Sequence, residues 1–185
     1  MKLFIASDIH GSMHYLAKML DAFKKENADR LVLLGDVLYH GPRNDLPEEY
    51  NPKAVIQELN KISDKIICVR GNCDTEVDQM VLEFPIMADY SVIFDGDITL
   101  YLTHGHNKQT IEKTIPPSSY LLYGHTHVPS AAKVFGHWEL NPGSVSIPKE
   151  NSQHGYILYS DKCFTWKTLD GEAYNTLKAG DYDEN

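Results

Sequence analysis

The chain has 185 residues, of which 42% are hydrophobic and 23% charged, and this ordinary balance excludes an intrinsically disordered protein. The formal net charge of −9 argues against a broad basic surface, so we expect no stable complex with nucleic acid. This length suits one domain, which we expect over residues 1–185, with residues 180–185 as a frayed acidic tail.

Cysteine usage and the N-terminal segment bear on the compartment. Cys68, Cys73 and Cys163 form no Cys-x-x-Cys pair, and their odd number fits a reducing compartment better than a disulfide framework. The segment MKLFIASDIHG has too short an apolar run for a signal peptide, and there is no stretch of about 18 apolar residues that would span a membrane. We therefore expect a cytoplasmic protein with no membrane partner.

In chain order, the first half alternates short apolar strands with amphipathic helices. Leu16, Met19, Leu20 and Phe23 recur at helical spacing and form one apolar stripe. The expected elements are a strand over 3–6, a helix over 14–27, a strand over 31–34, a helix over 54–62 and a strand over 66–69. This order predicts parallel strands that are joined by right-handed crossovers.

The second half is mostly strand-like. Asp95-Gly96 is a strong turn signal, and it predicts a hairpin between the two strands that flank it. The expected strands cover 91–94, 98–103, 121–123, 131–135, 156–159 and 163–168. A sandwich of two sheets with helices outside accommodates both halves.

Polar clusters directly follow several of these strands. The clusters occupy residues 8–11, 35–36, 70–74, 104–106 and 124–127. Because α/β sheets bind ligands at the carboxyl ends of their strands, we expect all the clusters to form one site. In extended backbone, residues i and i+2 point to the same side, so Asp8 and His10 are expected to face one cleft. The same spacing places His125 and His127 on that cleft.

The residue types in these clusters indicate a metal site. Asp, His and Asn together suit Mn, Fe, Zn or Ni better than a thiolate-bound structural zinc. Each piece has a simpler reading: Asp8-Ile9-His10 as surface polarity, Gly35-Asp36 as a turn or helix cap, and Asn72 as an Asx-turn residue. The whole set, at strand ends and in this order, favours the metal site.

This ordered set resembles the motifs of the calcineurin-like metallophosphoesterase family. The motifs stand here as Asp8-Ile9-His10, Gly35-Asp36, Gly71-Asn72-Cys73-Asp74, His104-Gly105-His106 and Gly124-His125-Thr126-His127. The resemblance covers residues 3–148 and extends to the segments GDVLYHGPRN, VRGNCDTEVDQM and NPGSVSIPK. It implies the α/β fold class, as a four-layer α/β/β/α sandwich of two mixed β-sheets flanked by helices.

The resemblance also implies a site with two divalent metal ions. The implied ligands are Asp8, His10 and His127 for one ion, Asn72, His104 and His125 for the other, and Asp36 as the bridge between them. Asp36 and Asn72 are implied in catalysis, with a metal-bridging hydroxide as the nucleophile. We expect Mn, with Zn, Fe, Ni or Co as alternatives.

Cys73 departs from the broader family pattern, which often has His at this position to protonate the leaving group. A thiol is a poorer proton donor, so good leaving groups would need no acid and poor ones another donor. His106, His40 and His14 are the candidates for that donor, and the residue pattern does not choose among them. Cys73 could equally be a small buried hydrophobic residue, which is the interpretation we favour.

Other residues are expected to support the site. Arg43 and Cys73 are the expected substrate-binding residues, since Arg43 follows the Asp36 strand in a loop and could contact phosphate with two N–H groups. A solvated loop arginine is an equal alternative. Asp74 and His106 are expected to orient the metal ligands.

These expectations converge on a metal-dependent phosphoesterase, and most directly on a phosphodiesterase. Its partner would be a small-molecule phosphate ester, and self-association into a homo-oligomer is open. A phosphomonoesterase or nucleotide hydrolase on the same site is the alternative within the enzymes. A non-catalytic protein-binding scaffold, as in a retromer subunit of eukaryotic cells that resembles this family, is the alternative of another class. That subunit lacks part of the histidine set, whereas every implied ligand position is filled here.

Overall fold

The computed structural model describes residues 1–180, so the expected frayed tail lies, apart from Gly180, outside the described residues. In chain order the elements are β1 (Leu3–Ala6), α1 (Met13–Glu26), β2 (Arg30–Leu33), α2 (Pro52–Asn60), η1 (Ser63–Lys65), β3 (Ile66–Cys68), α3 (Glu76–Gln79), β4 (Tyr90–Asp95), β5 (Ile98–Thr103), η2 (Lys108–Thr110), β6 (Tyr120–Leu122), β7 (Ser130–Val134), β8 (His137–Asn141), β9 (Gly155–Ser160), β10 (Cys163–Thr168) and β11 (Ala173–Lys178).

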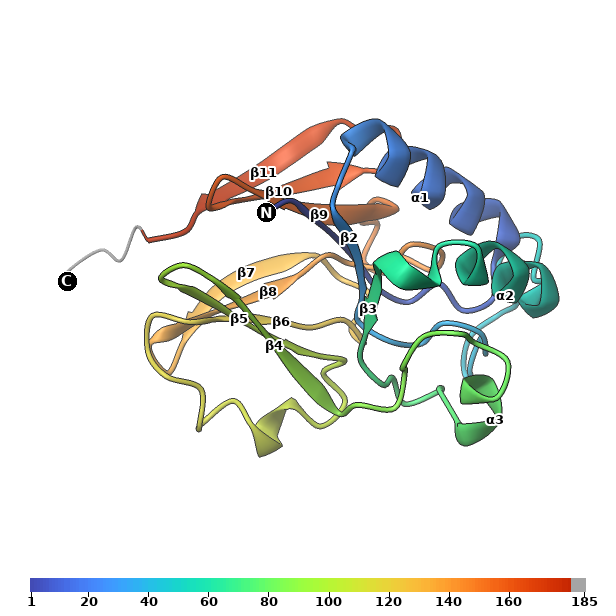
Figure 1. Cartoon of the computed structure of the whole chain (residues 1–185), viewed down its shortest axis with the longest axis horizontal. Coiled ribbons are helices and arrows are strands. Elements are labelled where there is room, and N and C mark those ends of the chain that lie inside the picture. Colours follow the sequence, from blue (N-terminus) through green and yellow to red (C-terminus); the bar gives the residue numbers. More distant parts are fainter. Residues whose placement is uncertain (181–185) are drawn as a thin grey trace.

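These strands form two mixed sheets that pack face to face (Figure 1). The first sheet has the order β11-β10-β9-β1-β2-β3, and the second has the order β4-β5-β6-β8-β7. Strands β1, β2 and β3 run parallel to one another, as do β5, β6 and β8. The predicted α/β class, with two mixed sheets, is therefore confirmed.

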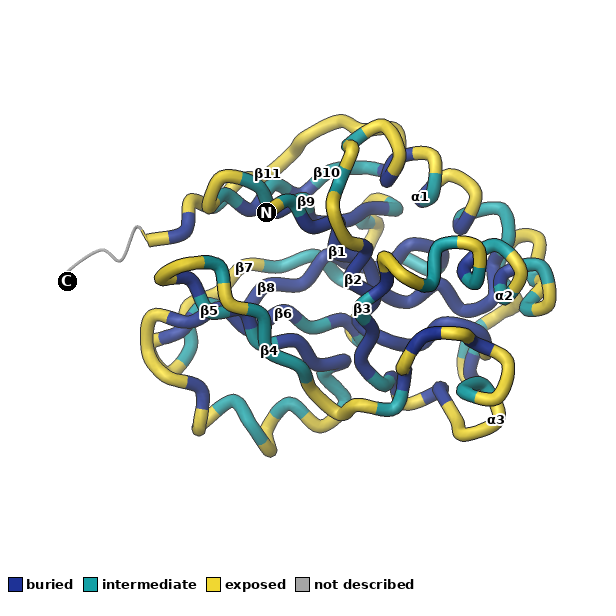
Figure 2. The backbone as a smooth tube through the Cα atoms, viewed as in Figure 1, coloured by how far each residue is buried: buried dark blue, intermediate teal, exposed yellow. Residues whose placement is uncertain are grey.

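Strand β1 is buried on both faces, which explains its continuous apolar run (Figure 2). Phe4 and Ala6 contact the core cluster that lies under the helices, whereas Leu3 and Ile5 contact the cluster between the two sheets. The cluster between the sheets also contains Leu140 of β8. Because this cluster takes residues from both halves of the chain, we infer that the described residues fold as one domain.

Helices α1 and α2 cover the outer face of the first sheet (Figure 1). The Ser12 hydroxyl caps α1 by accepting a hydrogen bond from the Tyr15 N–H at 3.3 Å, and Asn27 ends the helix with φ 50°. In the same way, the Asn51 side chain caps α2, in which Pro52 is the first helical residue. None of the described helices combines the length and the apolar character that a bilayer crossing requires.

The outer face of the second sheet is covered by a loop, whereas helices cover the outer face of the first sheet. All the α-helices of the described residues precede β4. The connection between β5 and β6 carries the 3-10 helix η2, where the expected sandwich has a helix layer (Figure 1). An ion pair between Lys108 and Glu139 of β8 attaches this connection to the sheet. The fourth layer is thus a loop with one short helical turn.

All the predicted strands and helices are present with bounds that agree within about two residues, but the sequence pattern does not predict β8, β11 or α3. The segment of β8 mixes Trp138 and Leu140, which contact the core, with buried polar residues. Strand β11 is largely exposed, and it forms by pairing with β10. Helix α3 has four residues and depends on a capping box between Thr75 and Asp78.

The carboxylate of Glu26 ties the end of α1 to the first sheet. It accepts a hydrogen bond from the Tyr156 hydroxyl at 2.8 Å and forms ion pairs with Lys167 and Lys2. Burial alone would raise the pKa of Glu26, but the contacts with Lys167 and Tyr156 outweigh it, and the pKa is lowered.

We expect Glu26→Gln to lower the free energy of unfolding at pH 7 by about 1–2 kcal/mol. A carboxylate with a lowered pKa stabilises the fold above its unfolded pKa of about 4.3, and this contribution disappears as the pH falls through the folded pKa. Urea unfolding at pH 7 and at about pH 3 measures the difference. An equal loss of unfolding free energy at both pH values would contradict this expectation. Glu58→Gln serves as the control, because Glu58 forms a more exposed ion pair with Lys61.

Candidate metal centre

Five of the seven predicted ligands lie on left-handed turns, so the argument from extended backbone is wrong for Asp8, His10, His125 and His127. The backbone angle φ is 59° at Asp8, 49° at His10, 53° at Asp36, 65° at His125 and 62° at His127. Non-glycine residues seldom adopt this region, although Asp and His tolerate it better than most. Each such residue adds strain of about 1–3 kcal/mol, which persists only where the surrounding structure enforces it, and such residues cluster at functional sites.

Two serines enforce the turn at Asp8. The hydroxyl groups of Ser144 and Ser146 both donate to the Asp8 carbonyl oxygen, at 2.9 and 3.0 Å. On the other side, the His10 N–H donates to the Asp36 carbonyl oxygen at 2.9 Å. The first two polar clusters are therefore held to each other, and to the segment that follows β8, through buried backbone hydrogen bonds.

Two glycines let the turns approach each other. A Cβ atom on Gly124 would lie 2.8 Å from Asp8 Oδ2, and one on Gly71 would lie 2.1 Å from Asp36 Oδ1. Because no side chain fits at either distance, the Gly-Asn and Gly-His motifs need glycine at these positions.

The first group of candidate ligand atoms consists of Asp8 Oδ1, His10 Nε2 and His127 Nε2. Asp8 Oδ1 lies 3.6 Å from His10 Nε2 and 3.3 Å from His127 Nε2, and the two nitrogens are 3.3 Å apart. All three side chains are buried.

The hydrogen bonds of the other ring nitrogens set the tautomers of these histidines. His10 Nδ1 lies 2.7 Å from the Tyr39 carbonyl oxygen, and His127 Nδ1 lies 2.7 Å from the Ile147 carbonyl oxygen. A carbonyl oxygen only accepts hydrogen bonds, so both Nδ1 atoms carry protons, and in the neutral rings both Nε2 atoms carry lone pairs. Second partners of this kind are typical of metal-ligating histidines.

The second group consists of Asp36 Oδ2, Asn72 Oδ1 and His104 Nε2. His104 Nε2 lies 3.0 Å from Asn72 Oδ1 and 3.4 Å from Asp36 Oδ2, while its Nδ1 lies 2.6 Å from the Leu34 carbonyl oxygen. Asp36 Oδ2 is also 3.8 Å from His10 Nε2. Asp36 therefore lies between the two groups, where a bridging ligand would lie.

A divalent cation fits this arrangement of electron-rich atoms. Asp8 Oδ1 is buried and accepts no hydrogen bond from the described residues. The ligand atoms of Asp8, His10 and His127 all lie within 4.8 Å of one another, as do those of Asp8, Asp36 and His104. Carboxylate, imidazole and amide donors suit Mn, Fe, Zn, Ni or Co.

Charge coupling within the site shifts the ionisation of its members. Burial alone would raise the pKa of Asp8, but the rings of His10 and His127 hold it well below its usual range. Burial likewise opposes ionisation of Asp36, yet His104 lowers its pKa. Despite its own burial, His104 has a pKa raised to about 9 by the Asp36 and Asp8 carboxylates. The carboxylates thus stay ionised and ready to hold a cation.

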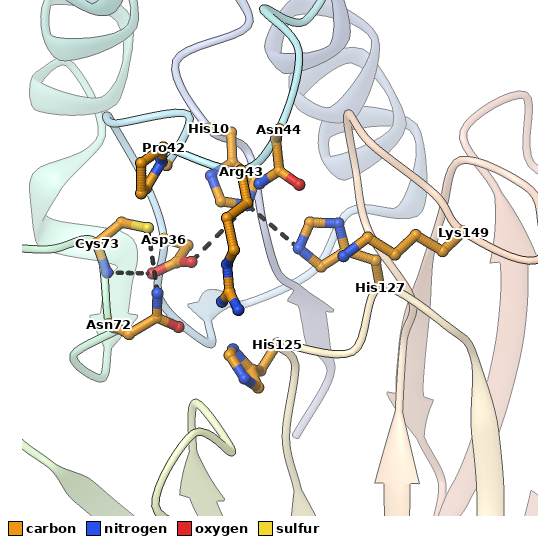
Figure 3. A pocket seen from close by; sticks show the side chains of 11 residues that line it. His10, Asp36, Pro42, Arg43, Asn44, Asn72, Cys73, His125, His127 and Lys149 are labelled. Carbon is orange, nitrogen blue, oxygen red and sulfur yellow. Dashed lines mark hydrogen bonds and ion pairs between the residues drawn. The ribbon is translucent and has the colours of Figure 1, made fainter.

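Several of these candidate ligands line a pocket with a volume of about 320 Å³ (Figure 3). Its lining residues are His10, Asp36, Gly41, Pro42, Arg43, Asn44, Asn72, Cys73, His125, His127 and Lys149. The Arg43 side chain extends towards Asn72 and His125, and the Lys149 side chain extends towards His127 (Figure 3). The His125 ring lies 5.1 Å from the His104 ring. Five of the seven predicted ligands therefore line one pocket. The other two, Asp8 and His104, lie behind this lining, 3.3 Å from His127 and 3.4 Å from Asp36.

Asp74 and His106, which the sequence predicts to orient the metal ligands, differ in their contacts. Asp74 accepts hydrogen bonds from the N–H groups of Asp36 and Gly71, at 2.9 and 2.7 Å, and so joins the turns that carry Asp36 and Asn72. His106 lies beside His104, with ring centroids 5.5 Å apart, and its orienting role stays a prediction. Burial and the neighbouring His104 lower the pKa of His106.

Cys73 is buried beside Asp36, and its N–H donates to Asp36 Oδ1 at 2.8 Å. Burial, together with the Asp36 carboxylate, raises the pKa of the Cys73 thiol, which favours the neutral form. The alternative proton donors are His14, His40 and His106. Within residues 1–180, none of these three lines the pocket of Figure 3.

The residue pattern misses several groups that shape the pocket. Tyr39, Ser144 and Ser146 act through backbone and hydroxyl contacts, and Lys149 and Asn44 line the pocket directly. The segment NPGSVSIPK contains three of these residues, and it carries the family resemblance, but nothing in its spacing indicates a contact with Asp8. That contact joins residues more than 130 positions apart in the chain.

A family model described as the calcineurin-like phosphoesterase superfamily domain matches residues 1–162. The chain belongs to this family. The family is metal-dependent, in agreement with the ligand atoms described above. The family predicted from the motifs is thereby confirmed.

Members of the calcineurin-like phosphoesterase family include close relatives of this chain. It is 48% identical over 158 residues to phosphodiesterase YfcE of Escherichia coli (strain K12), covering 84% of this chain and 85% of that protein. The solved structure of YfcE, a phosphoesterase from E. coli, matches with a TM-score of 0.92 and 42% identity over 97% of this chain and 100% of that chain. Zinc-bound Vps29 from Entamoeba histolytica matches with a TM-score of 0.60 and 17% identity over 96% of this chain and 98% of that chain, which shows the fold alone.

We expect the double variant Ser144→Ala/Ser146→Ala to bind Mn about 10–100-fold more weakly, because the Asp8 turn loses both hydroxyl donors. Titration calorimetry of the metal-free protein with MnCl₂ measures the affinity. Ser160→Ala is the control, since its hydroxyl contacts Asp161 in the turn between β9 and β10. Wild-type affinity in the double variant would show that the serines do not hold the ligand turn.

Proposed function

We propose that this protein is a metal-dependent phosphodiesterase that hydrolyses phosphate diesters. The observation that carries the proposal is the convergence of Asp8, His10 and His127 on one side of Asp36, and of Asn72 and His104 on the other. The 48% identical relative is named a phosphodiesterase, which supports the diester preference.

We further propose two divalent ions, with Mn first and Zn, Fe, Ni or Co as alternatives. Asp8, His10 and His127 would hold one ion, Asn72, His104 and His125 the other, and Asp36 both. When bound, such ions supply positive charge and acidify water, which is the chemistry that phosphate ester hydrolysis needs.

The protein's own residues would position the ester. Arg43 and Lys149 line the pocket and form no ion pair within residues 1–180, so both guanidinium and ammonium groups are free to contact phosphate oxygens. Asn72 keeps its Oδ1 towards His104, because its amide nitrogen donates to Cys73 Sγ at 3.2 Å. The thiol of Cys73 closes the wall beside Asp36 without adding a charge.

Two alternatives make different use of the same fold. A phosphomonoesterase or nucleotide hydrolase would use the same ligands, and a panel of monoesters and diesters separates it from a phosphodiesterase. A non-catalytic protein-binding scaffold needs no converging ligand atoms, and the convergence of Asp8, His10 and His127 in a buried position argues against it. The cytoplasmic location and the homo-oligomer stay predictions.

Purified protein with MnCl₂ is expected to release nitrophenol from bis(4-nitrophenyl) phosphate. Asp36→Asn is expected to retain less than about 1% of the wild-type kcat/KM and to bind less Mn, because the side chain between the two ligand groups loses its charge. Absorbance kinetics and metal analysis provide the two readouts.

Asp161→Asn is the matched control, since it makes the same substitution in the exposed turn before β10. Absence of turnover with each of Mn, Ni, Co and Zn would reject the phosphodiesterase. Protein that holds no metal under any of these conditions would favour the scaffold instead.

A further inference from the structure

An apolar groove adjoins the metal pocket. It has a volume of about 430 Å³, and its lining residues are Leu38, Tyr39, Tyr50, Pro52, Ile56, Cys73, Thr75, Val77, Asp78 and Val81. Cys73 lines both the groove and the metal pocket, so the two spaces meet at this side chain. None of the seven predicted metal ligands lines the groove.

The wall between the two spaces is fixed by contacts to the metal ligands. The Tyr39 carbonyl oxygen accepts the hydrogen bond of His10 Nδ1, while the Tyr39 side chain lines the groove. On the same wall, the Cys73 N–H donates to Asp36 Oδ1. A group in the groove would therefore lie at a set distance from the atoms that would hold the phosphate.

The apolar character of the groove is unusual for an open surface. Val77, Val81 and Tyr39 are 67%, 43% and 42% exposed, and they lie together along its rim. Exposed apolar side chains that gather beside a polar site are typical of ligand-binding surfaces.

The groove disfavours negatively charged groups. Its one carboxylate, Asp78, already accepts hydrogen bonds from the N–H and hydroxyl groups of Thr75, at 2.8 and 3.0 Å. A second phosphate would be repelled by this carboxylate, whereas an uncharged ring would contact Tyr39, Tyr50 and the valines. The volume of about 430 Å³ accommodates an aromatic group.

We propose that this groove binds one ester substituent of the diester, an uncharged planar aromatic group, while the phosphate lies in the metal pocket. The inference rests on the proposed function and adds the substrate class: phosphate diesters that carry an aryl or heteroaryl group. Diesters with two small alkyl groups would leave the groove empty and bind more weakly.

The test uses two probes that share the phosphate-like head. Phenylphosphonate carries an aromatic ring, whereas inorganic phosphate carries none, and titration calorimetry of the Mn-loaded protein measures the Kd of each. In the double variant Val77→Asn/Val81→Asn, we expect the Kd of phenylphosphonate to rise about fivefold or more and that of phosphate to stay unchanged. Both valines are exposed, so the variant is expected to fold, and urea unfolding checks this.

Met80→Asn is the matched control, because Met80 is 82% exposed on the same segment and does not line the groove. An unchanged Kd of phenylphosphonate, an equal rise for both probes, or the same rise in Met80→Asn would each overturn the proposal. If sedimentation shows that the double variant has a different oligomeric mass from the wild type, while both Kd values are unchanged, the groove would instead be a contact between copies of this chain. Since binding is measured without turnover, the result is separate from failure of the phosphodiesterase assay.

Discussion

The site depends on one electrostatic constraint: ring nitrogens with lone pairs and ionised carboxylates face one another at the ends of the strands. His10 Nε2 and His127 Nε2 lie 3.3 Å apart, and both point at the buried Asp8 carboxylate. Because carbonyl oxygens hold the Nδ1 protons of both rings, neither nitrogen offers a proton to the other in the neutral state. Such an arrangement favours a positive charge in its centre, and a bound metal ion would supply one.

The fold holds this arrangement through strained backbone. Left-handed turns at Asp8, His10 and Asp36 direct their side chains inward, and the surrounding hydrogen bonds enforce them. Strand β1 is buried on both faces, so the turn that follows it starts from a rigid position. The strain is therefore concentrated at the ends of well-packed strands, where it shapes the site and leaves the core regular.

The same rigidity links the metal centre to the space beside it. Tyr39 contributes its carbonyl oxygen to His10 and its side chain to the apolar groove, and Cys73 contributes its N–H to Asp36 and its side chain to both spaces. The same two residues thus connect the candidate metal ligands to the groove. Identity of 48% with a phosphodiesterase supports the shared chemistry, whereas selection of the ester by the groove is our proposal.

The sequence by itself determined the family, the two mixed sheets and the candidate ligands, because Asp, His, Asn and Gly occur in a fixed order at strand ends. It did not predict strand β8 or β11, since one mixes core and buried polar residues and the other is an exposed edge that needs its partner. The prediction that Asp8 and His10 face one cleft because they lie on extended backbone gave the wrong reason. The local sequence pattern does not reveal that both residues adopt a left-handed turn.

Only the tertiary structure decided which distant residues complete the site. Ser144 reaches Asp8 across 136 positions, Lys149 enters the metal pocket, and Cys73 divides that pocket from the groove. Such contacts depend on how two sheets pack, and packing brings together segments whose local sequence carries no record of the partner. Residue types and their order are sufficient to indicate the metal chemistry, whereas the shape around it belongs to the fold.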